Sequence, residues 1–438
     1  MGVFAKNTLI TFLTRMATAI STIIITVIMA RVLGPKGQGI YSVAILFPSL
    51  LLIFTGFGLN LSAVYFLGKE KYPPRQVLGT SIIFNFLISV LTILIGLLVI
   101  FTFSDKFFPD IERVYLFLSL SLVPLILFFN LGCQTVLGLQ KINKYNFISF
   151  FQSGLFLIFV AILLFTLRFG VTVAILSQIF SYAVAIALLS FIAVKETKGI
   201  DFKINFKYLK ESLIYGLKVH LAGIFDFLHS RIDLFLINFF INPFSAGIYF
   251  ASVRLAEGVW LFSSSTSTVL FPKVVSEKDP KKLKEFTPLV CRNVLFLSFL
   301  IIAFLFIISG WFITFLYSAD YLAAILPFKI ILIGILAISG CNILSIDLAA
   351  RGNPMLNTCA IGASAVLNIV LNIIFIQKWG ISGAAFATTV SYAVMFFITL
   401  IFYIKISGNK ITDIIFIKKE DFILYKDVFL SIKTKLIK

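Results

Sequence analysis

The sequence predicts an all-α integral membrane protein that crosses the membrane twelve times. Of its 438 residues, 60% are hydrophobic and only 13% are charged, against the ~25% charged residues of typical soluble domains. Mean hydropathy over the whole chain is +1.06. Soluble domains of this total length would need far more polar residue to cover their surfaces. The hydrophobic residues form continuous rather than alternating runs, which favours helices over a barrel.

Twelve apolar stretches reach the roughly 20 residues that a membrane-crossing helix needs. The first of them lacks a convincing small-residue cleavage site and is too long for a signal peptide, so we expect it to remain as an uncleaved span. The predicted spans are 8–33, 39–66, 78–103, 114–138, 145–167, 171–194, 212–241, 245–270, 289–317, 323–350, 356–377 and 381–406.

Lysine and arginine set the predicted orientation. If the N-terminus is cytoplasmic, the cytoplasmic segments hold 25 of these residues and the external loops hold 6, as expected because positive charge collects in cytoplasmic loops. Both termini are therefore predicted to be cytoplasmic. The same asymmetry explains the net charge of +18, so no nucleic-acid partner is expected.

The sequence contains an internal repeat. Residues Arg31–Tyr41 (RVLGPKGQGIY) match Phe239–Tyr249 (FFINPFSAGIY) at an offset of 208, and Phe169–Val184 (FGVTVAILSQIFSYAV) match Trp379–Val394 (WGISGAAFATTVSYAV) at an offset of 210. Two matches at nearly one offset indicate a repeat of six spans. Because six is even, both repeats start on the cytoplasmic side, and such parallel repeats are typical of transporters that rock one half against the other.

The repeat defines the predicted domain organisation. We expect an N-terminal six-helix lobe at 1–194, a basic cytoplasmic linker at 195–211 and a C-terminal six-helix lobe at 212–406. A basic cytoplasmic tail follows at 407–438.

Both repeats resemble one family of membrane proteins. The opening KNTLITFLTR…ARVLGPKGQGIYSVA and the later segment RIDLFLINFFINPFSAGIYFASVRLAEGVW are similar to polysaccharide biosynthesis proteins, the Wzx-type O-antigen and exopolysaccharide flippases. These belong to the multidrug/oligosaccharidyl-lipid/polysaccharide exporter superfamily.

The resemblance implies a V-shaped bundle of twelve helices in two parallel lobes, located in the bacterial cytoplasmic (inner) membrane. It implies transport of an oligosaccharide linked to undecaprenyl diphosphate, for O-antigen (lipopolysaccharide), capsule or exopolysaccharide synthesis. The partners it implies are that lipid-linked substrate, membrane lipids and the polysaccharide polymerase or chain-length machinery.

Charged side chains within spans are candidate functional residues because lipid does not solvate them. The span at 212–241 is the richest, and on a helical projection its polar residues form two roughly opposite stripes. One stripe is expected to pack against neighbouring helices and the other to face a wet cavity. The charged and histidine residues of this span are Lys218, His220, Asp226, His229, Arg231 and Asp233.

A diphosphate cargo would favour arginine, whose planar fork donates two hydrogen bonds and stays protonated, while sugar hydroxyls favour amides. The predicted substrate-binding residues are Arg15, Lys218, Arg231, Arg254, Asn60, Asn368 and Asn372. The predicted ion-coupling residues are Asp226, Asp233 and Glu257.

Structural roles are the alternatives for these residues. Arg254 could pair with Glu257, His229 could pair with Asp233, and Arg15 could extend to the membrane surface. Amides within spans also join helices to one another.

The sequence excludes several other activities. It contains no Walker A motif, metal-ligand set or Ser/His/Asp set, and it has only two histidines, so we expect neither an enzyme nor a cofactor. An ion gradient or consumption of the product would then drive transport. A drug/cation antiporter and a lipid II flippase of the same superfamily remain alternatives; the latter usually carries two more spans. A glycan polymerase or ligase is disfavoured by the short external loops.

Overall fold

The computed structural model describes residues 3–167, 170–276 and 279–421, which form helices joined by short connections. The helices of the N-terminal half are α1 (Val3–Thr55), α2 (Leu59–Gly68), α3 (Pro74–Phe107), α4 (Arg113–Leu120), α5 (Leu122–Gly138), α6 (Ile142–Leu167) and α7 (Gly170–Thr197). Those that follow are α8 (Phe206–Phe240), α9 (Pro243–Ser276), α10 (Pro280–Leu316), the 3₁₀ helix η1 (Ala319–Ala324), α11 (Ile325–Ala350), α12 (Pro354–Ser407) and α13 (Ile411–Ile415).

The predicted spans all fall on these helices, which confirms an all-helical, multi-pass membrane protein. Eight helical segments in the described part of the chain are long and apolar enough to cross a membrane. The segment in α12 contains two predicted spans, 356–377 and 381–406. The segment in α1 contains most of the predicted span 8–33 and the first part of 39–66, which continues into α2. The predicted spans at 212–241 and 245–270, which lie in α8 and α9, are not among the eight; these helices carry most of the charged residues found within spans.

Glycines with positive φ mark the bends between spans. Gly34 bends α1 at φ 65° and Gly380 bends α12 at φ 60°. Gly170, which begins α7, has φ 57° and is the repeat equivalent of Gly380. Residues other than glycine rarely adopt this conformation. The two repeats therefore share a glycine turn at this position as well as the helix that follows it.

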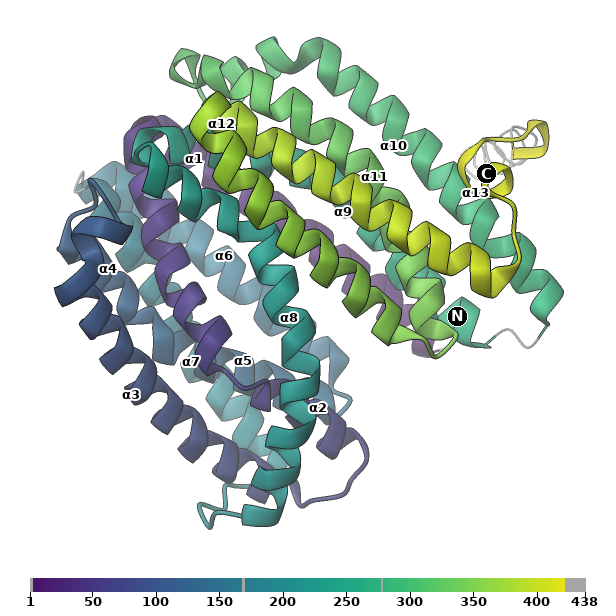
Figure 1. Ribbon diagram of the computed structural model, residues 1–438. Helices are drawn as coiled ribbons and strands as arrows, with labels where there is room; N and C mark the ends of the chain where they lie inside the picture. Colours follow the sequence, from purple (N-terminus) through teal and green to yellow (C-terminus); the bar gives the residue numbers. More distant parts are fainter. Residues whose placement is uncertain (1–2, 168–169, 277–278, 422–438) are drawn as a thin grey trace, which may run out of the picture.

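The two halves of the chain form two groups of helices. Figure 1 shows the blue helices α3 to α7 on one side and the green-to-yellow helices α10 to α12 on the other. The halves meet where α1 packs along α9. Gly39 and Gly247 cross there so closely that a Cβ on Gly39 would lie 1.7 Å from the Pro243 oxygen, and one on Gly247 would lie 1.9 Å from the Pro35 oxygen. These residues are repeat equivalents, so the contact is reciprocal, as expected at a two-fold axis.

Helix α8 contacts both halves. Its first part packs on α2, where Gly216 meets the backbone of Gly58, and His220 Nε2 lies 2.8 Å from the Ile53 oxygen of α1. Its second part packs on α12. The helix also starts at Phe206, within the segment that the sequence assigned to the linker.

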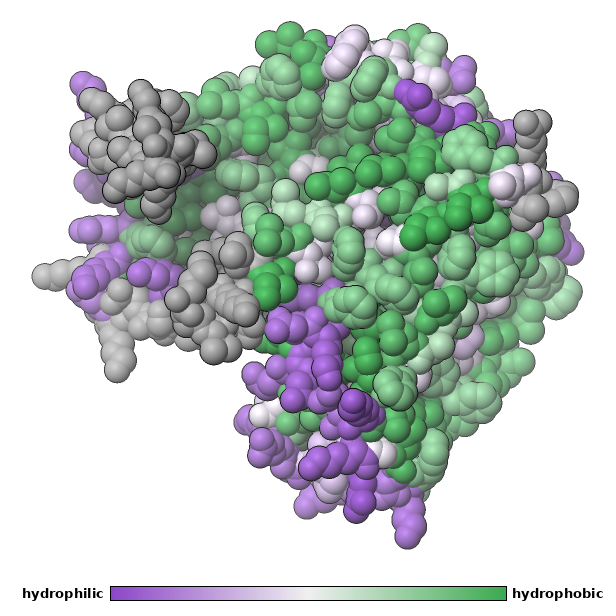
Figure 2. Space-filling view, turned by 180° about the vertical axis from the view of Figure 1, so that it is seen from behind, coloured by the Kyte–Doolittle hydropathy of each residue, from purple (hydrophilic) through white to green (hydrophobic). Residues whose placement is uncertain are grey.

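The outer surface fits a lipid environment. Figure 2 shows a broad apolar face with hydrophilic residues gathered at one end of the molecule. Large apolar side chains are exposed along several helices, as expected where lipid replaces water. Examples are Phe86, Leu94, Phe101, Phe165, Phe191, Phe304 and Ile307.

Candidate functional site

Two arginines from neighbouring helices converge on one carboxylate. Arg231 of α8 places Nη1 3.0 Å from Oε1 of Glu257, and Arg254 of α9 places Nη1 2.9 Å from Oε2 of the same side chain. Arg254 and Glu257 lie three residues apart and so share one face of α9. The guanidinium of Arg254 also lies 4.8 Å from the ring centre of Phe250, a cation–π contact. The predicted Arg254–Glu257 pair is present, and Arg231 joins it.

These arginines line two adjoining cavities between the halves. The first, of about 290 Å³, is lined from the C-terminal half by Arg231 and Arg254 and from the N-terminal half by polar side chains of α1, α6 and α7. The second, of about 230 Å³, contains Glu257 as well as both arginines. The polar N-terminal residues of the first cavity are Thr18, Thr22, Thr26, Tyr41, Ser42, Ser49, Gln152, Ser153, Gln178 and Tyr182.

The tyrosines of this cavity were not among the predicted site residues, although both lie in motifs that the internal repeat shares. Tyr41 closes the shared Gly-Ile-Tyr motif, and Tyr182 lies in the shared Ser-Tyr-Ala-Val motif. Tyr41 donates a hydrogen bond of 2.6 Å to Gln178 Oε1. The motifs shared by the two repeats could therefore have identified these polar residues between the halves.

The equivalent residues of the second half build a buried polar network instead. Tyr249, the equivalent of Tyr41, donates to Asp233 at 2.5 Å, and Thr388, the equivalent of Gln178, lies 3.4 Å from the same carboxylate oxygen. His229 lies 3.0 Å from the hydroxyl of Ser391. The proposed His229–Asp233 pairing is thus replaced by contacts of both residues with α12 or α9.

The predicted asparagines lie inside the helix groups and away from the two cavities. Asn368 donates to Ser391 at 3.0 Å and accepts from Asn372 at 3.0 Å, and both asparagines are fully buried. Asn60 accepts a bond of 2.9 Å from Asn85. In the structure these amides join neighbouring helices.

The remaining predicted residues are more accessible. Arg15 is exposed and donates to Thr268 of α9 at 3.2 Å, which links the two halves outside the cavities. Lys218 and Asp226 are exposed on α8. The structure therefore brings Arg231, Arg254 and Glu257 together and leaves the other candidates outside this cluster.

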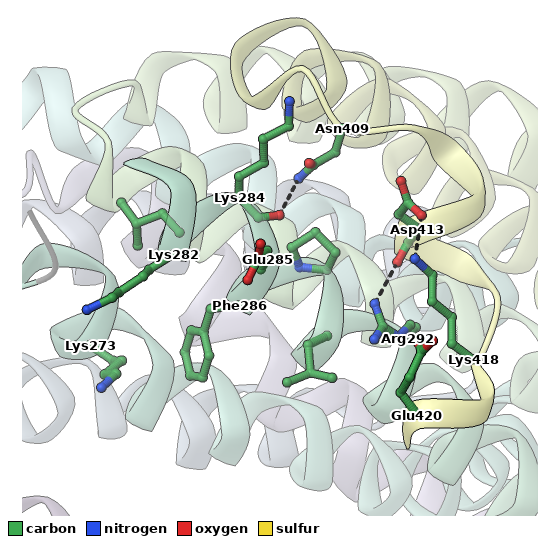
Figure 3. A pocket seen from close by; sticks show the side chains of 13 residues that line it. Lys273, Lys282, Lys284, Glu285, Phe286, Arg292, Asn409, Asp413, Lys418 and Glu420 are labelled. Atoms are coloured by element: carbon green, nitrogen blue, oxygen red, sulfur yellow. Dashed lines mark hydrogen bonds and ion pairs between the residues drawn. The ribbon is translucent and has the colours of Figure 1, made fainter. Parts of the chain in front are cut away.

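A larger cavity of about 750 Å³ lies at the end of the C-terminal half where α10 begins (Figure 3). It is bordered by the start of α10 and by the tail after α12. Arg292 donates two hydrogen bonds, of 2.6 and 2.7 Å, to Asp421, and Lys418 pairs with Asp413 at 2.6 Å. Its lining comes from the C-terminal half and the tail alone, so it does not lie between the halves.

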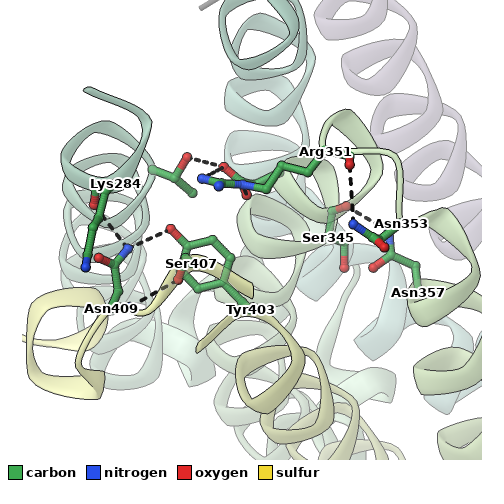
Figure 4. Close-up of polar contacts among 10 residues, drawn as sticks. Lys284, Ser345, Arg351, Asn353, Asn357, Tyr403, Ser407 and Asn409 are labelled. Atoms are coloured by element: carbon green, nitrogen blue, oxygen red, sulfur yellow. Dashed lines mark hydrogen bonds and ion pairs between the residues drawn. The ribbon is translucent and has the colours of Figure 1, made fainter. Parts of the chain in front are cut away.

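Polar contacts anchor the tail beside this cavity (Figure 4). Asn409 Nδ2 donates to the Lys284 oxygen and to the Tyr403 hydroxyl, each at 3.1 Å. Nearby, Arg351 pairs with Asp347, which lies four residues earlier at the end of α11. Together with the Arg292–Asp421 pair, the contact of Asn409 with Lys284 holds this part of the tail against α10.

Relatives are archaeal membrane proteins. The uncharacterized membrane protein MJ1375 of Methanocaldococcus jannaschii is 25% identical over 87% of this chain and 93% of its own length. The probable low-salt glycan biosynthesis flippase Agl15 of Haloferax volcanii is 27% identical over 44% of this chain and 41% of its own.

Solved structures share the fold. A lipid II flippase MurJ in an inward closed conformation aligns with a TM-score of 0.76 at 18% identity, covering 98% of this chain and 93% of that one. An inward-facing MATE multidrug transporter aligns with a TM-score of 0.75 at 15% identity, covering 89% and 94%. The chain thus shares the fold of this MATE transporter and this MurJ flippase. The model of one family, polysaccharide biosynthesis protein, matches residues 28–326, so the chain belongs to the polysaccharide biosynthesis protein family.

Proposed function

We propose that this protein moves an oligosaccharide linked to a polyprenyl diphosphate from the inner to the outer leaflet of the cytoplasmic membrane, for the synthesis of surface polysaccharide. The observation that carries the proposal is the pair of arginines, Arg231 and Arg254, on the wall of a cavity lined by both halves. Membership of the family and the likeness to a probable glycan flippase support the same class of substrate.

The chemistry of the cavity suits this cargo. Two guanidiniums outnumber the single carboxylate of Glu257, so the cluster has a net positive charge that would attract a diphosphate. Opposite them, Gln152, Gln178 and Tyr182 offer amide and hydroxyl groups to sugars. An oligosaccharide is flexible and hydrated, so it suits a polar cavity. If the halves opened toward the bilayer, the lipid chain of the cargo would stay in the bilayer.

Transport would proceed by alternating access. The twelve spans would form two parallel six-helix lobes, with both termini cytoplasmic, that rock about the Gly39–Gly247 contact while α8 stays attached to both. Asp233 and the exposed Asp226 remain the proposed ion-coupling groups. Asp233 is buried among the hydroxyls of Tyr249 and Thr388, where a change of charge would alter the packing of α8 on α12.

A drug/cation antiporter is less consistent with the cavity. Such a transporter needs acidic groups that face its cargo, whereas Glu257 already engages two arginines and Asp233 is buried away from the cavity lining. A cation would therefore meet net positive charge.

Substitution of each arginine by lysine tests the proposal. If Arg231 and Arg254 hold a diphosphate with two-pronged hydrogen bonds, Arg→Lys keeps the charge but loses the geometry, and most export should be lost. The assay is surface polysaccharide in cells that lack their own copy of the gene and carry each variant at matched membrane abundance. Lys329→Arg is the control, because Lys329 lines neither cavity and contacts Phe306. Full export by both Lys variants would show that the cavity needs only positive charge and not the two-pronged hydrogen bonds of arginine.

A further inference from the structure

Glu257 occupies the position that an anionic ligand of the arginines would take. Each of its carboxylate oxygens accepts from a different guanidinium, at 3.0 Å from Arg231 and 2.9 Å from Arg254. A phosphate group accepts from arginine in the same way, through separate oxygens. The carboxylate therefore satisfies the same donors that the proposed diphosphate would need.

The cluster is accessible rather than sealed. The side chains of Arg231 and Arg254 are each 27% exposed and that of Glu257 is 21% exposed. Both arginines also line the 290 Å³ cavity, of which Glu257 is not a lining residue. An anion could thus approach both guanidiniums from that cavity and then compete with Glu257 for their donors.

The arginines retain unused hydrogen-bonding capacity. Nε of Arg254 is buried without a partner in the described part of the chain, although a guanidinium carries five N–H donors. The ring of Phe250 limits the directions that this guanidinium can take. A ligand that turned Arg254 away from Glu257 could therefore accept from Nε, which has no partner in the described part of the chain.

We propose that Glu257 is an internal counter-ion that competes with the substrate. It pairs with Arg231 and Arg254 while the site is empty, yields them to the diphosphate of the lipid-linked glycan, and displaces that diphosphate again when the cargo leaves. No covalent step is involved. This inference rests on the proposed function, because it takes the arginines as the diphosphate site.

The proposal predicts that one substitution in the site raises the affinity for a diphosphate instead of lowering it. Glu257→Gln keeps the shape of the side chain and removes its charge, so the repulsion between carboxylate and diphosphate disappears. Affinity for a diphosphate should rise, by roughly tenfold or more for two like charges a few ångströms apart. Export should nevertheless fall, because the competitor that promotes release is missing. A purely structural ion pair predicts no gain in affinity.

Binding to the purified full-length protein in lipid nanodiscs measures this effect. The ligands are inorganic pyrophosphate and geranylgeranyl diphosphate, which separate the contribution of the phosphates from that of the lipid chain. Glu112→Gln is the matched control, since it removes one exposed carboxylate at the start of α4, outside both cavities. Glu257→Asp is a second variant; its shorter side chain cannot bridge both arginines and should give an intermediate gain.

The outcomes separate the two proposals. Tighter diphosphate binding by Glu257→Gln, abolished when Arg254→Ala is added, supports the counter-ion. Arginine-dependent binding by the wild type with unchanged or weaker binding by both Glu257 variants overturns the counter-ion and leaves the arginine site standing. Binding that does not depend on either arginine overturns the diphosphate site and the counter-ion together.

Discussion

Replacement of Gly39 by alanine should force the two halves of the protein apart. An ideal Cβ at this position lies 1.7 Å from the carbonyl oxygen of Pro243. A carbon–oxygen contact needs about 3.3 Å, so α1 and α9 would have to separate by about 1.6 Å along this line. The atom that the new Cβ meets is a backbone oxygen, so no side chain can move aside to relieve the contact.

The energetic cost follows from this geometry. Added methyl groups in a packed interior cost about 1–3 kcal/mol, and occasionally more, and a rigid backbone contact belongs at the upper end. At roughly 2–4 °C per kcal/mol for a domain of about 200 residues, we expect Gly39→Ala to lower the melting temperature by several degrees. Export should fall as well, because this contact is the proposed axis of rocking.

The reciprocal contact provides an internal check. A Cβ on Gly247 lies 1.9 Å from the Pro35 oxygen, so Gly247→Ala should behave alike. Because either methyl already separates the helices, the double variant should cost less than the sum of the two single variants. Gly154→Ala is the control, since apart from the adjoining residues and backbone of its own helix no atom lies within 4 Å of the added carbon.

Thermal unfolding in detergent and surface polysaccharide at matched abundance are the two measurements. If Gly39→Ala and Gly154→Ala have the same melting temperature and the same export, α1 and α9 do not cross as closely as described. Additive losses in the double variant would show that the two glycines do not share one contact.

Three further predictions concern other parts of the molecule. Tyr321→Phe removes a buried hydrogen bond of 2.5 Å to Gln38 Oε1 and leaves that oxygen without its donor, which should cost about 1–3 kcal/mol, measured as a lower melting temperature; an unchanged value would contradict the contact. The Arg292 guanidinium, by hydrogen bonding, holds the pKa of Asp421 below its usual value, so this pair stabilises the docked tail above the unfolded pKa of about 3.9 and loses that effect as the pH falls through the lowered value. Asp421→Asn should mimic acidification and expose Lys418 to trypsin at neutral pH, and equal cleavage of variant and wild type would refute this. A reporter inserted after Phe206 should be active only inside the cell, and external activity would reverse the predicted orientation.

The sequence was sufficient to predict the helices and their repeat. Lipid requires long apolar runs and satisfied backbone groups, so the positions of the spans follow directly from the hydropathy of the sequence. The bends at Gly34 and Gly380 were harder to predict. A glycine between two apolar runs gives the same sequence pattern whether the helix ends there or only bends. Helix α8 shows a related limit, since burial of its first part against α2 depends on contacts between distant glycines.

The candidate site was predictable only in part. The charge of Arg231, Arg254 and Glu257 marked them as candidates. One carboxylate can bridge both arginines only because α9 turns the face that carries Glu257 toward α8. Asn368 and Asn372 carry the same polarity signal and are buried between helices. Sequence polarity identifies groups that avoid lipid, whereas the choice between a cavity and a helix contact depends on helix rotation.

The central claim is that Arg231 and Arg254 recognise the diphosphate of a lipid-linked glycan. The direct measurement is flipping in proteoliposomes that contain the purified protein and one of two lipids with the same oligosaccharide, joined either through a diphosphate or through an uncharged linkage. Appearance of the glycan on the opposite leaflet is followed with an added lectin. The account predicts flipping of the diphosphate lipid by the wild type, little flipping of the uncharged lipid, and loss of flipping when both arginines are replaced by lysine. Equal flipping of the two lipids, or full activity of the double Lys variant, would contradict it.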